Sequence, residues 1–302
     1  MAQVESKSAP VAPVVAASGG ITARERFGHA VAQALMYLPL VLWVGFTVFA
    51  FLWIITASFK DNHELFANAW ALPKTLHFEN YDKAWRLARM GNYFLNSVFI
   101  VSISTGLILA LSAPAAYVLS RIPFRGRELL SNSFIAGMGV PYQVLLVPLF
   151  LLLTQIRLVD TMPGLIIVYV ALSLPFTIFV LMGFFRSLPS ELEDAGAIDG
   201  ASEWQLFYEV MLPLASPGII TAAIFNFIGL WNEYMLALVM INDQNKRTLS
   251  LALYGLQGSM QYTADWVGLF AGVVIVMLPT LLLFIVMSER VIEGITLGAT
   301  KG

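Results

Sequence analysis

Long apolar stretches alternate with short polar connectors along most of this chain. Six stretches contain no Asp, Glu, Lys or Arg: residues 28–58, 94–120, 129–156, 161–185, 210–232 and 266–288. About 20 helical residues cross the ~30 Å hydrocarbon core of a bilayer, so each stretch is long enough to span it. None shows the strict alternation of a transmembrane β-barrel strand. The pattern predicts an all-α membrane protein with six transmembrane helices.

A polar segment, residues 188–213, leads into the fifth stretch and begins with the pattern of a short helix. Ser190 and Glu193 have the spacing of a capping box, in which each side chain satisfies a free amide of the first turn. We expect the helix to stop at Asp199 and Gly200, because glycine adopts left-handed backbone without the strain that a Cβ causes.

A second helix is predicted after this turn, ending at Pro213. Ser202 and Gln205 repeat the capping-box spacing at its start. Four apolar residues recur at i, i+3, i+4 and i+7, which places them on one helical face: Trp204, Phe207, Tyr208 and Met211. Two short helices joined by a glycine turn, between membrane spans, indicate a surface that another protein grips.

Composition excludes an ordinary soluble domain. Charged residues make up 12% of the chain, about half the fraction typical of soluble proteins, and hydrophobic residues make up 58%. The mean hydropathy is +0.77. Residues 1–27 begin with a stretch rich in Ala, Val, Ser and Pro without periodicity, so we expect a disordered cytoplasmic tail there and one transmembrane domain over residues 28–302.

Basic residues near the span ends predict the orientation. Five arginines flank the first two spans on one side: Arg24, Arg26, Arg121, Arg125 and Arg127. The positive-inside rule places them in the cytoplasm. The longer connector over residues 59–93 also carries Lys and Arg and must lie on the opposite side, but the rule is read mainly from short loops. Both termini and residues 188–213 are then cytoplasmic.

No catalytic or metal-binding pattern occurs in the sequence. There is no G-x-x-x-x-G-K-[ST] motif, so the chain is not expected to bind nucleotide through a P-loop of its own. His29, His63 and His77 are too far apart along the chain to suggest a metal cluster, and there is no cysteine. We therefore expect no enzymatic activity, cofactor or metal in this chain, and no nucleic-acid partner.

Two polar islands interrupt the apolar spans. Asn232 and Glu233 lie in the run GLWNEYMLALVMIN, and Tyr142 and Gln143 follow Pro141 in the third span. A carboxylate inside a span costs roughly 2.5 to 3.5 kcal/mol at the helix centre and usually faces a cavity or a partner. Interfacial water explains the first pair equally well, and hydrogen bonds between helices explain the second.

The segment ELEDAGAIDGASEWQLFYEVMLPL resembles the cytoplasmic loop called the EAA motif in permease subunits of bacterial ABC importers. Further stretches, in the same order, resemble the maltose-type carbohydrate branch: NSVFIVSISTGLILALSAPAAYVLSRIPFRGR, VPYQVLLVPLFLLL, LPFTIFVLMGFFRSLPSELEDA, WNEYMLALV and ERVIEGITLGATKG. The resemblance implies a type I ABC importer permease architecture, as the six-helix partner subunit. Ala116, Tyr117 and Arg121 match a family signature for which the sequence offers no chemical role.

The resemblance also implies partners and a mechanism. An extracytoplasmic sugar-binding protein delivers sugar; this chain and a homologous second permease form the pathway in the cell's inner membrane, among its lipids; an ATP-binding subunit dimer uses ATP and moves the docked loop. We call residues 188–213 the coupling loop. Its residues that match the family's coupling region are Glu193, Asp194, Ala195, Gly196, Asp199, Gly200 and Ala201. The C-terminal GATKG matches tails that reach the ATPase interface.

The sequence departs from the motif at its start. Asp194, Ala195 and Gly196 stand where the family reads Glu-Ala-Ala, and Ala197 stands where arginine is common. Glycine lowers helix propensity by roughly 1 kcal/mol relative to alanine, so the first helix of the coupling loop is expected to be less rigid.

Sugars need amide and carboxylate partners with aromatic faces, so the polar islands are the candidate substrate pathway. Each helical step turns by about 100°, so Asn232 and Glu233 face different ways; Asn232 is favoured as pathway-facing, with Glu233 at the outer rim or paired to the second permease. Tyr142 and Gln143 are the further candidates. Alternatives are a permease for glycerol phosphate or a peptide, an ion-coupled secondary transporter and a membrane scaffold. A glycerol phosphate permease would show basic residues in its spans, and these spans contain none. An ion-coupled transporter would show repeated half-helices, and no such repeat is visible.

Overall fold

The computed structural model describes residues 23–299, and these form helices and no strands. The chain divides into two units, Met1–Leu52 and Trp53–Gly302, and α1 (Ala23–Ser58) crosses the boundary. Residues 1–22 of the expected tail lie outside the described residues. Residues 23–27 belong to α1, which begins ahead of the predicted start at residue 28.

Four helices are long and apolar enough to cross a membrane by themselves. They are Leu35–Ser58 of α1, α4 (Met90–Arg121), α7 (Met162–Ser187) and Trp266–Met287 of α14 (Trp266–Ala299). Two helix pairs are long and apolar enough when each pair is taken together: α5 (Arg127–Met138) with α6 (Tyr142–Gln155), and Glu203–Leu214 with α11 (Ser216–Asn232). The predicted count of six therefore holds when each bent pair is one span.

The predicted stretches 129–156 and 210–232 each contain a break between two helices. The first pair is bent by 102° and the second by 71°. Proline explains both positions, because it lacks the N–H that would continue a helix and disfavours helical backbone in the residue before it. Pro141 lies at the first break and Pro217 directly after the second.

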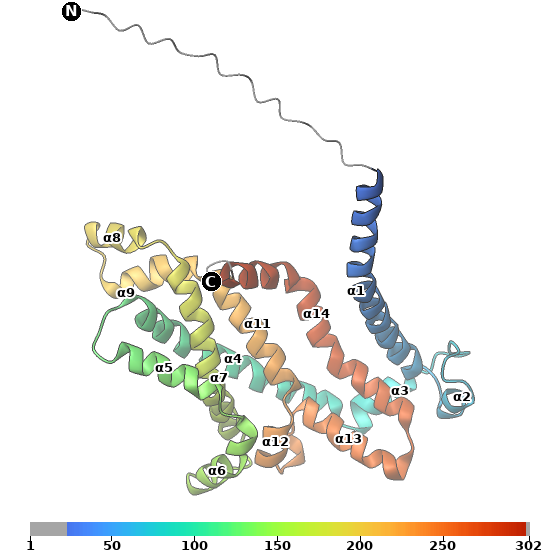
Figure 1. Ribbon diagram of the computed structural model, residues 1–302. Coiled ribbons are helices and arrows are strands. Elements are labelled where there is room, and N and C mark those ends of the chain that lie inside the picture. The colour runs from blue at the N-terminus through green and yellow to red at the C-terminus, as the bar shows by residue number, and fades with distance from the viewer. Residues whose placement is uncertain (1–22, 300–302) are drawn as a thin grey trace, which may run out of the picture. The chain divides into compact units, whose positions relative to one another are not determined.

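The remaining helices lie between these spans, except for two that form part of Glu203–Leu214. They are α2 (Asn62–Ala67), α3 (Glu79–Asp82), α8 (Glu191–Ile198), α9 (Glu203–Gln205), α10 (Leu212–Leu214), α12 (Met235–Met240) and α13 (Leu249–Thr263). Two π-helical segments, Lys83–Leu87 and Leu206–Met211, and a 3-10 turn, Gln244–Lys246, complete the described chain. Figure 1 shows α8 and α9 beyond one end of α7, whereas α6 and α12 lie near its other end.

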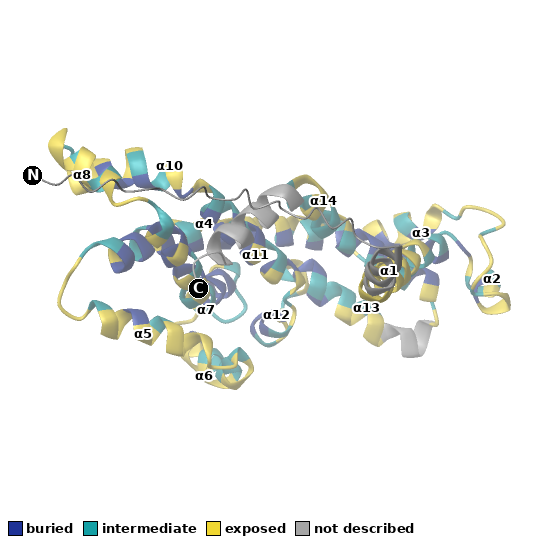
Figure 2. Cartoon of the chain, turned by 45° about the horizontal axis from the view of Figure 1, so that its top comes forward, coloured by how far each residue is buried: buried dark blue, intermediate teal, exposed yellow. Residues whose placement is uncertain are grey.

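Burial is concentrated where α4 and α7 pack against each other and against α11. One buried cluster lies around Tyr169, Trp231 and Met90, and a second lies around Tyr117, Phe185 and Phe207 beside the coupling loop. Figure 2 shows that α5 and α6 are largely exposed by comparison; Ser131 is the one buried residue of α5 and Leu153 that of α6. A span with so little of its surface buried is covered by lipid or by another subunit in a membrane.

Candidate functional site

The first half of the coupling loop is α8, which begins differently from the prediction. Ser190 has helical backbone and its side chain makes no capping hydrogen bond. A side-chain cap at this position needs extended backbone, so the predicted Ser190–Glu193 capping box is absent. The Glu193 carboxylate instead lies 3.6 Å from the guanidinium of Arg121, at the end of α4. Glu193 therefore forms an ion pair with another helix and not the predicted cap with Ser190.

The turn and the start of the second helix confirm the prediction. The last residue of α8 is Ile198, and Gly200 has left-handed backbone with φ of +74°. The Ala201 N–H donates to the Gly196 carbonyl at 2.9 Å, which closes the end of α8. Ser202 and Gln205 form a complete capping box, with side-chain to backbone bonds in both directions.

The predicted single apolar face of the second helix is divided in the structure. Phe207 and Met211 are buried, 3% and 0% exposed, against the ends of α4 and α7. Trp204 and Tyr208 are 66% and 56% exposed and stack on each other with ring centroids 6.0 Å apart. Residues Leu206–Met211 form a π-helical turn, in which residues five apart are bonded, so the α-helical register used for the prediction does not hold there.

The seven predicted coupling residues lie together on α8 and its turn. Four are exposed: Asp194, Ala195, Asp199 and Gly200. Three are partly buried against the rest of the chain: Glu193, Gly196 and Ala201. Ile198 is 86% exposed as well, so the coupling loop exposes both acidic side chains and large apolar ones, including the Trp204–Tyr208 pair.

Close packing explains why residue 196 is glycine, which the sequence did not reveal. A Cβ on this residue would lie 2.8 Å from Cδ1 of Leu206, so the absent side chain lets the two helices of the coupling loop approach closely. Whether α8 is less rigid for containing glycine stays a prediction.

We expect Gly196→Ala to keep the stability of the coupling loop, because the end of the Leu206 side chain can move and alanine gains roughly 1 kcal/mol of helix propensity. Gly196→Val places a branched Cβ in the same space and should destabilise the fold by about 1–3 kcal/mol. Thermal unfolding of both purified variants measures this. Equal midpoints would show that the contact with Leu206 does not set the helix spacing.

A cavity of about 850 Å³ lies beside the middle of α7 and is lined by the bend between α5 and α6, by α7 and by the end of α11. Tyr142, Tyr169 and Phe176 supply aromatic faces, and Asn232 and Glu233 supply an amide and a carboxylate. None of the 17 described residues that line it is lysine or arginine. The cavity therefore combines a mostly apolar wall with a few polar groups, as small-molecule sites do.

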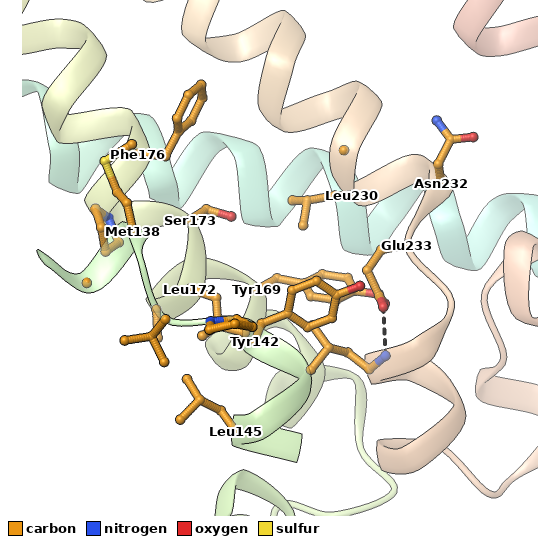
Figure 3. A pocket seen from close by; sticks show the side chains of 17 residues that line it. Met138, Tyr142, Leu145, Tyr169, Leu172, Ser173, Phe176, Leu230, Asn232 and Glu233 are labelled. Carbon is orange, nitrogen blue, oxygen red and sulfur yellow. Dashed lines mark hydrogen bonds between the residues drawn. The ribbon is translucent and has the colours of Figure 1, made fainter. Parts of the chain in front are cut away.

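Glu233 is held by the protein and does not lie on a continuous helix. α11 ends at Asn232, and Glu233 has extended backbone. Its Oε1 accepts the Leu236 N–H at 2.7 Å; its Oε2 accepts the Tyr169 hydroxyl at 2.7 Å and the Ala237 N–H at 3.3 Å. Figure 3 shows its side chain directed towards Tyr169. Glu233 thus caps α12 and ties it to α7.

This geometry corrects the helical-face argument for Asn232 and Glu233, because the helix stops between them. Asn232 is exposed, points away from Glu233 in Figure 3 and donates to the Ile228 carbonyl at 2.8 Å. Tyr142 joins Glu233 in the cavity lining, whereas Gln143 is exposed and does not line it. Sequence reasoning missed Tyr169, since a tyrosine within an apolar span carries no local signal of its partner.

Hydrogen bonds also join the loop before α7 to the loop after α12. The Asp160 N–H donates to the Met240 carbonyl at 2.8 Å, and Asp160 Oδ1 accepts the N–H groups of Asn242 and Asp243. The backbone N–H of Asn245 and the Lys246 side chain hold the pKa of Asp243 below its ordinary value. The start of α7 and the end of α12 are therefore fixed to each other.

The fold defines a helical protein with several membrane-spanning segments, an exposed coupling loop beyond one end of α7 and a cavity beside the middle of α7. Residues 102–291 match the family described as binding-protein-dependent transport system inner membrane component. The chain is 41% identical to the diacetylchitobiose uptake system permease protein NgcG of Streptomyces coelicolor, with 89% of each covered. It is 35% identical to the trehalose transport system permease protein SugB of Mycobacterium tuberculosis, covering 86% of this chain and 95% of that protein.

A solved structure of a bacterial ABC transporter involved in the import of the acidic polysaccharide alginate contains a similar chain. It aligns with a TM-score of 0.73 and 21% identity, covering 89% of this chain and 98% of that one, and this likeness concerns the fold alone.

This chain belongs to the family of binding-protein-dependent transport system inner membrane components. Members are transmembrane permease subunits of ABC importers and leave ATP hydrolysis to other subunits. The predicted architecture and the prediction that this chain is not an enzyme are confirmed by that membership.

Proposed function

We propose that this chain is the permease subunit of an ATP-driven importer for an uncharged sugar, and that it forms the pathway with a homologous second permease. An extracytoplasmic sugar-binding protein delivers the substrate, and an ATP-binding subunit dimer drives transport. The names of the relatives support the sugar class, since they include diacetylchitobiose and trehalose. The observation that carries the proposal is the cavity, which has aromatic walls, an amide and a carboxylate.

The charge of the cavity distinguishes this proposal from an importer for glycerol phosphate. A phosphate is recognised by arginine or lysine, and neither lines the described cavity. Glu233 would also repel an anionic group. Asn232 is our candidate for a direct sugar contact, because its amide is exposed and donates to the Ile228 carbonyl of its own helix. Tyr142 is the candidate for stacking on the apolar face of a sugar ring.

The coupling loop supports docking onto the ATP-binding subunits. Its exposed Ile198, Trp204 and Tyr208 would be buried by a partner, and exposed apolar patches of this kind mark interaction sites. Ile122 and Pro123, at the start of the arginine-rich connector after α4, line one hollow with Glu193 of the same loop, which supports a cytoplasmic position for both and for the two chain termini. Of the C-terminal GATKG, residues 300–302 lie outside the described part of the chain.

We expect the isolated chain to bind no ATP, because it has no P-loop, and a thiol at position 204 to crosslink to an ATP-binding subunit in the assembled transporter. The chain contains no cysteine, so Trp204→Cys introduces a single reactive site. Leu72→Cys, at a residue 75% exposed in the connector expected on the opposite side, is the matched control and should not give this crosslink.

Uptake into proteoliposomes with a panel of sugar-loaded binding proteins then tests the substrate class. Stimulation of ATP hydrolysis by an uncharged sugar supports the proposal. Nucleotide binding by the isolated chain, or crosslinking of the ATP-binding subunit through position 72 instead of 204, would contradict the subunit assignment and the orientation respectively.

A further inference from the structure

Arg121, the last residue of α4, bonds to two other helices at once. Its Nε and Nη2 donate to the Phe185 carbonyl at 2.8 and 2.6 Å, and Nη2 also donates to the Leu188 carbonyl. Its Nη1 lies 3.6 Å from Oε2 of Glu193, and the side chain is only 11% exposed. Carbonyls in the last turn of a helix lack intrahelical partners, and a cation there is favoured by the helix dipole. Arg121 thus closes the end of α7 and reaches the start of α8.

Glu193 depends on this contact. Its side chain is 26% exposed, and its Oε1 is buried and accepts no hydrogen bond within the described part of the chain. A partly buried carboxylate of this kind is stabilised mainly by the cation that faces it. The ion pair therefore fixes the first turn of α8 relative to α4.

Tyr117 makes the corresponding contact with the second half of the coupling loop. It lies four residues before Arg121, on the same face of α4, and is 3% exposed. Its ring centroid is 5.6 Å from that of Phe185 and 5.1 Å from that of Phe207. One turn of α4 thus contacts the end of α7 and both helices of the coupling loop.

The covalent connection between α7 and α8 needs this support. Leu188, Pro189 and Ser190 alone join the two helices, and Leu188 has extended backbone with ψ of 144°. Rotation in this linker would let α8 move without moving α7. Arg121 prevents this, because it bonds to groups on both sides of the linker.

We propose that Arg121, with Tyr117, is a positioning residue that makes the coupling loop and the ends of α4 and α7 one rigid body. A displacement of the loop then moves α7 instead of being absorbed in the linker. α7 carries Tyr169 and Phe176, so the same movement reaches the cavity wall. The inference rests on the proposed function for the source of the displacement, but the rigid connection itself is a property of this chain.

The test compares Arg121→Gln with Arg125→Gln in the complete transporter in proteoliposomes. Arg125 is an exposed arginine in the same connector and serves as the matched control. We expect the amount of sugar taken up per ATP hydrolysed to fall by about tenfold or more in Arg121→Gln, since a partly buried anchor is removed, and to stay unchanged in the control. Arg121→Lys should restore part of it, because an ammonium keeps the charge but cannot form the guanidinium fork.

Arg121→Gln leaves the Glu193 carboxylate partly buried without its cation, which could itself disturb folding. The double variant Arg121→Gln with Glu193→Gln removes that charge too, so it separates loss of positioning from misfolding. Labels at Asp194→Cys and Phe179→Cys report the spacing of α8 and α7 by electron spin resonance, since the chain has no other thiol. The distance distribution should broaden in the double variant and remain narrow in Arg125→Gln.

An unchanged distribution, or a proportional fall of uptake and ATP hydrolysis, would overturn the inference. A wild-type complex that transports no sugar would instead refute the proposed function, while the label distances would still decide the role of Arg121.

Discussion

Gly200→Pro is expected to abolish sugar uptake while the chain still inserts and assembles. Gly200 has φ of +74°, whereas proline is fixed near −65°, so the turn between the two helices of the coupling loop cannot form. Proline also removes the Gly200 N–H that donates to the Ala197 carbonyl at 3.2 Å. The surface formed by Ile198, Trp204 and Tyr208 would then be broken into two parts. Uptake into vesicles, with immunodetection of the assembled complex, measures the effect.

Gly200→Asn is the matched control, because asparagine tolerates left-handed backbone better than other residues with a Cβ. It should retain most of the uptake. Asp199→Lys, which reverses a charge on the exposed side of the same turn, should abolish uptake with the turn intact. Normal uptake in the proline or lysine variant, with the ATP-binding subunit still attached, would show that this turn is not the coupling element.

The features of the coupling loop that could be predicted from the sequence are those that depend on residues close by in the sequence. The left-handed turn at Gly200 and the capping box of Ser202 with Gln205 depend on backbone and side chains within three residues, so the spacing alone reveals them. The Ser190–Glu193 prediction was wrong because Glu193 has a partner on another helix, Arg121, that local spacing does not show.

The same holds for the spans: their positions follow from the local sequence, whereas their bends depend on packing between helices. Apolar length predicted where each span lies, and Pro141 lies at the break in the third. The angle of 102° depends on what α6 packs against, namely α7 and α12, and the sequence contains no measure of that. The fifth stretch was predicted to end at residue 232, where α11 ends, but the helical-face argument wrongly continued the helix through Glu233. Glu233 leaves the helix to meet Tyr169 and the first amides of α12.

The sequence therefore indicated which kinds of residue line the cavity but not how these residues are arranged. Asn232, Glu233 and Tyr142 do line one cavity, but Gln143 does not. An aromatic beside amide and carboxylate groups suggested a sugar site, whereas the three hydrogen bonds to Glu233 show that its oxygens are largely occupied by this chain. The roles of these residues in transport stay predictions.

Glu233→Gln is expected to lower the stability of the chain, a larger effect than rim solvation of this residue would give. An amide keeps one acceptor oxygen where the carboxylate has two, so at least one of the donors from Tyr169, Leu236 and Ala237 loses its partner. A hydrogen bond to a charged group contributes about 1.5–3 kcal/mol, and the thermal unfolding midpoint should fall accordingly. Tyr169→Phe should lower it less, and the double variant should be less than additive, because both changes remove the same bond.

Asn232→Ala, at the adjacent position, is expected to change sugar uptake and not stability, the reverse of Glu233→Gln. The Asn232 side chain is exposed and bonds to the Ile228 carbonyl of its own helix, so its loss should change stability by no more than about 0.5 kcal/mol. If its amide contacts sugar, uptake at substrate levels below saturation should fall while the complex assembles normally. Wild-type kinetics in Asn232→Ala would remove it from the route and leave Tyr142 as the better candidate, and an unchanged unfolding midpoint in Glu233→Gln would show that Glu233 does not hold α12 to α7.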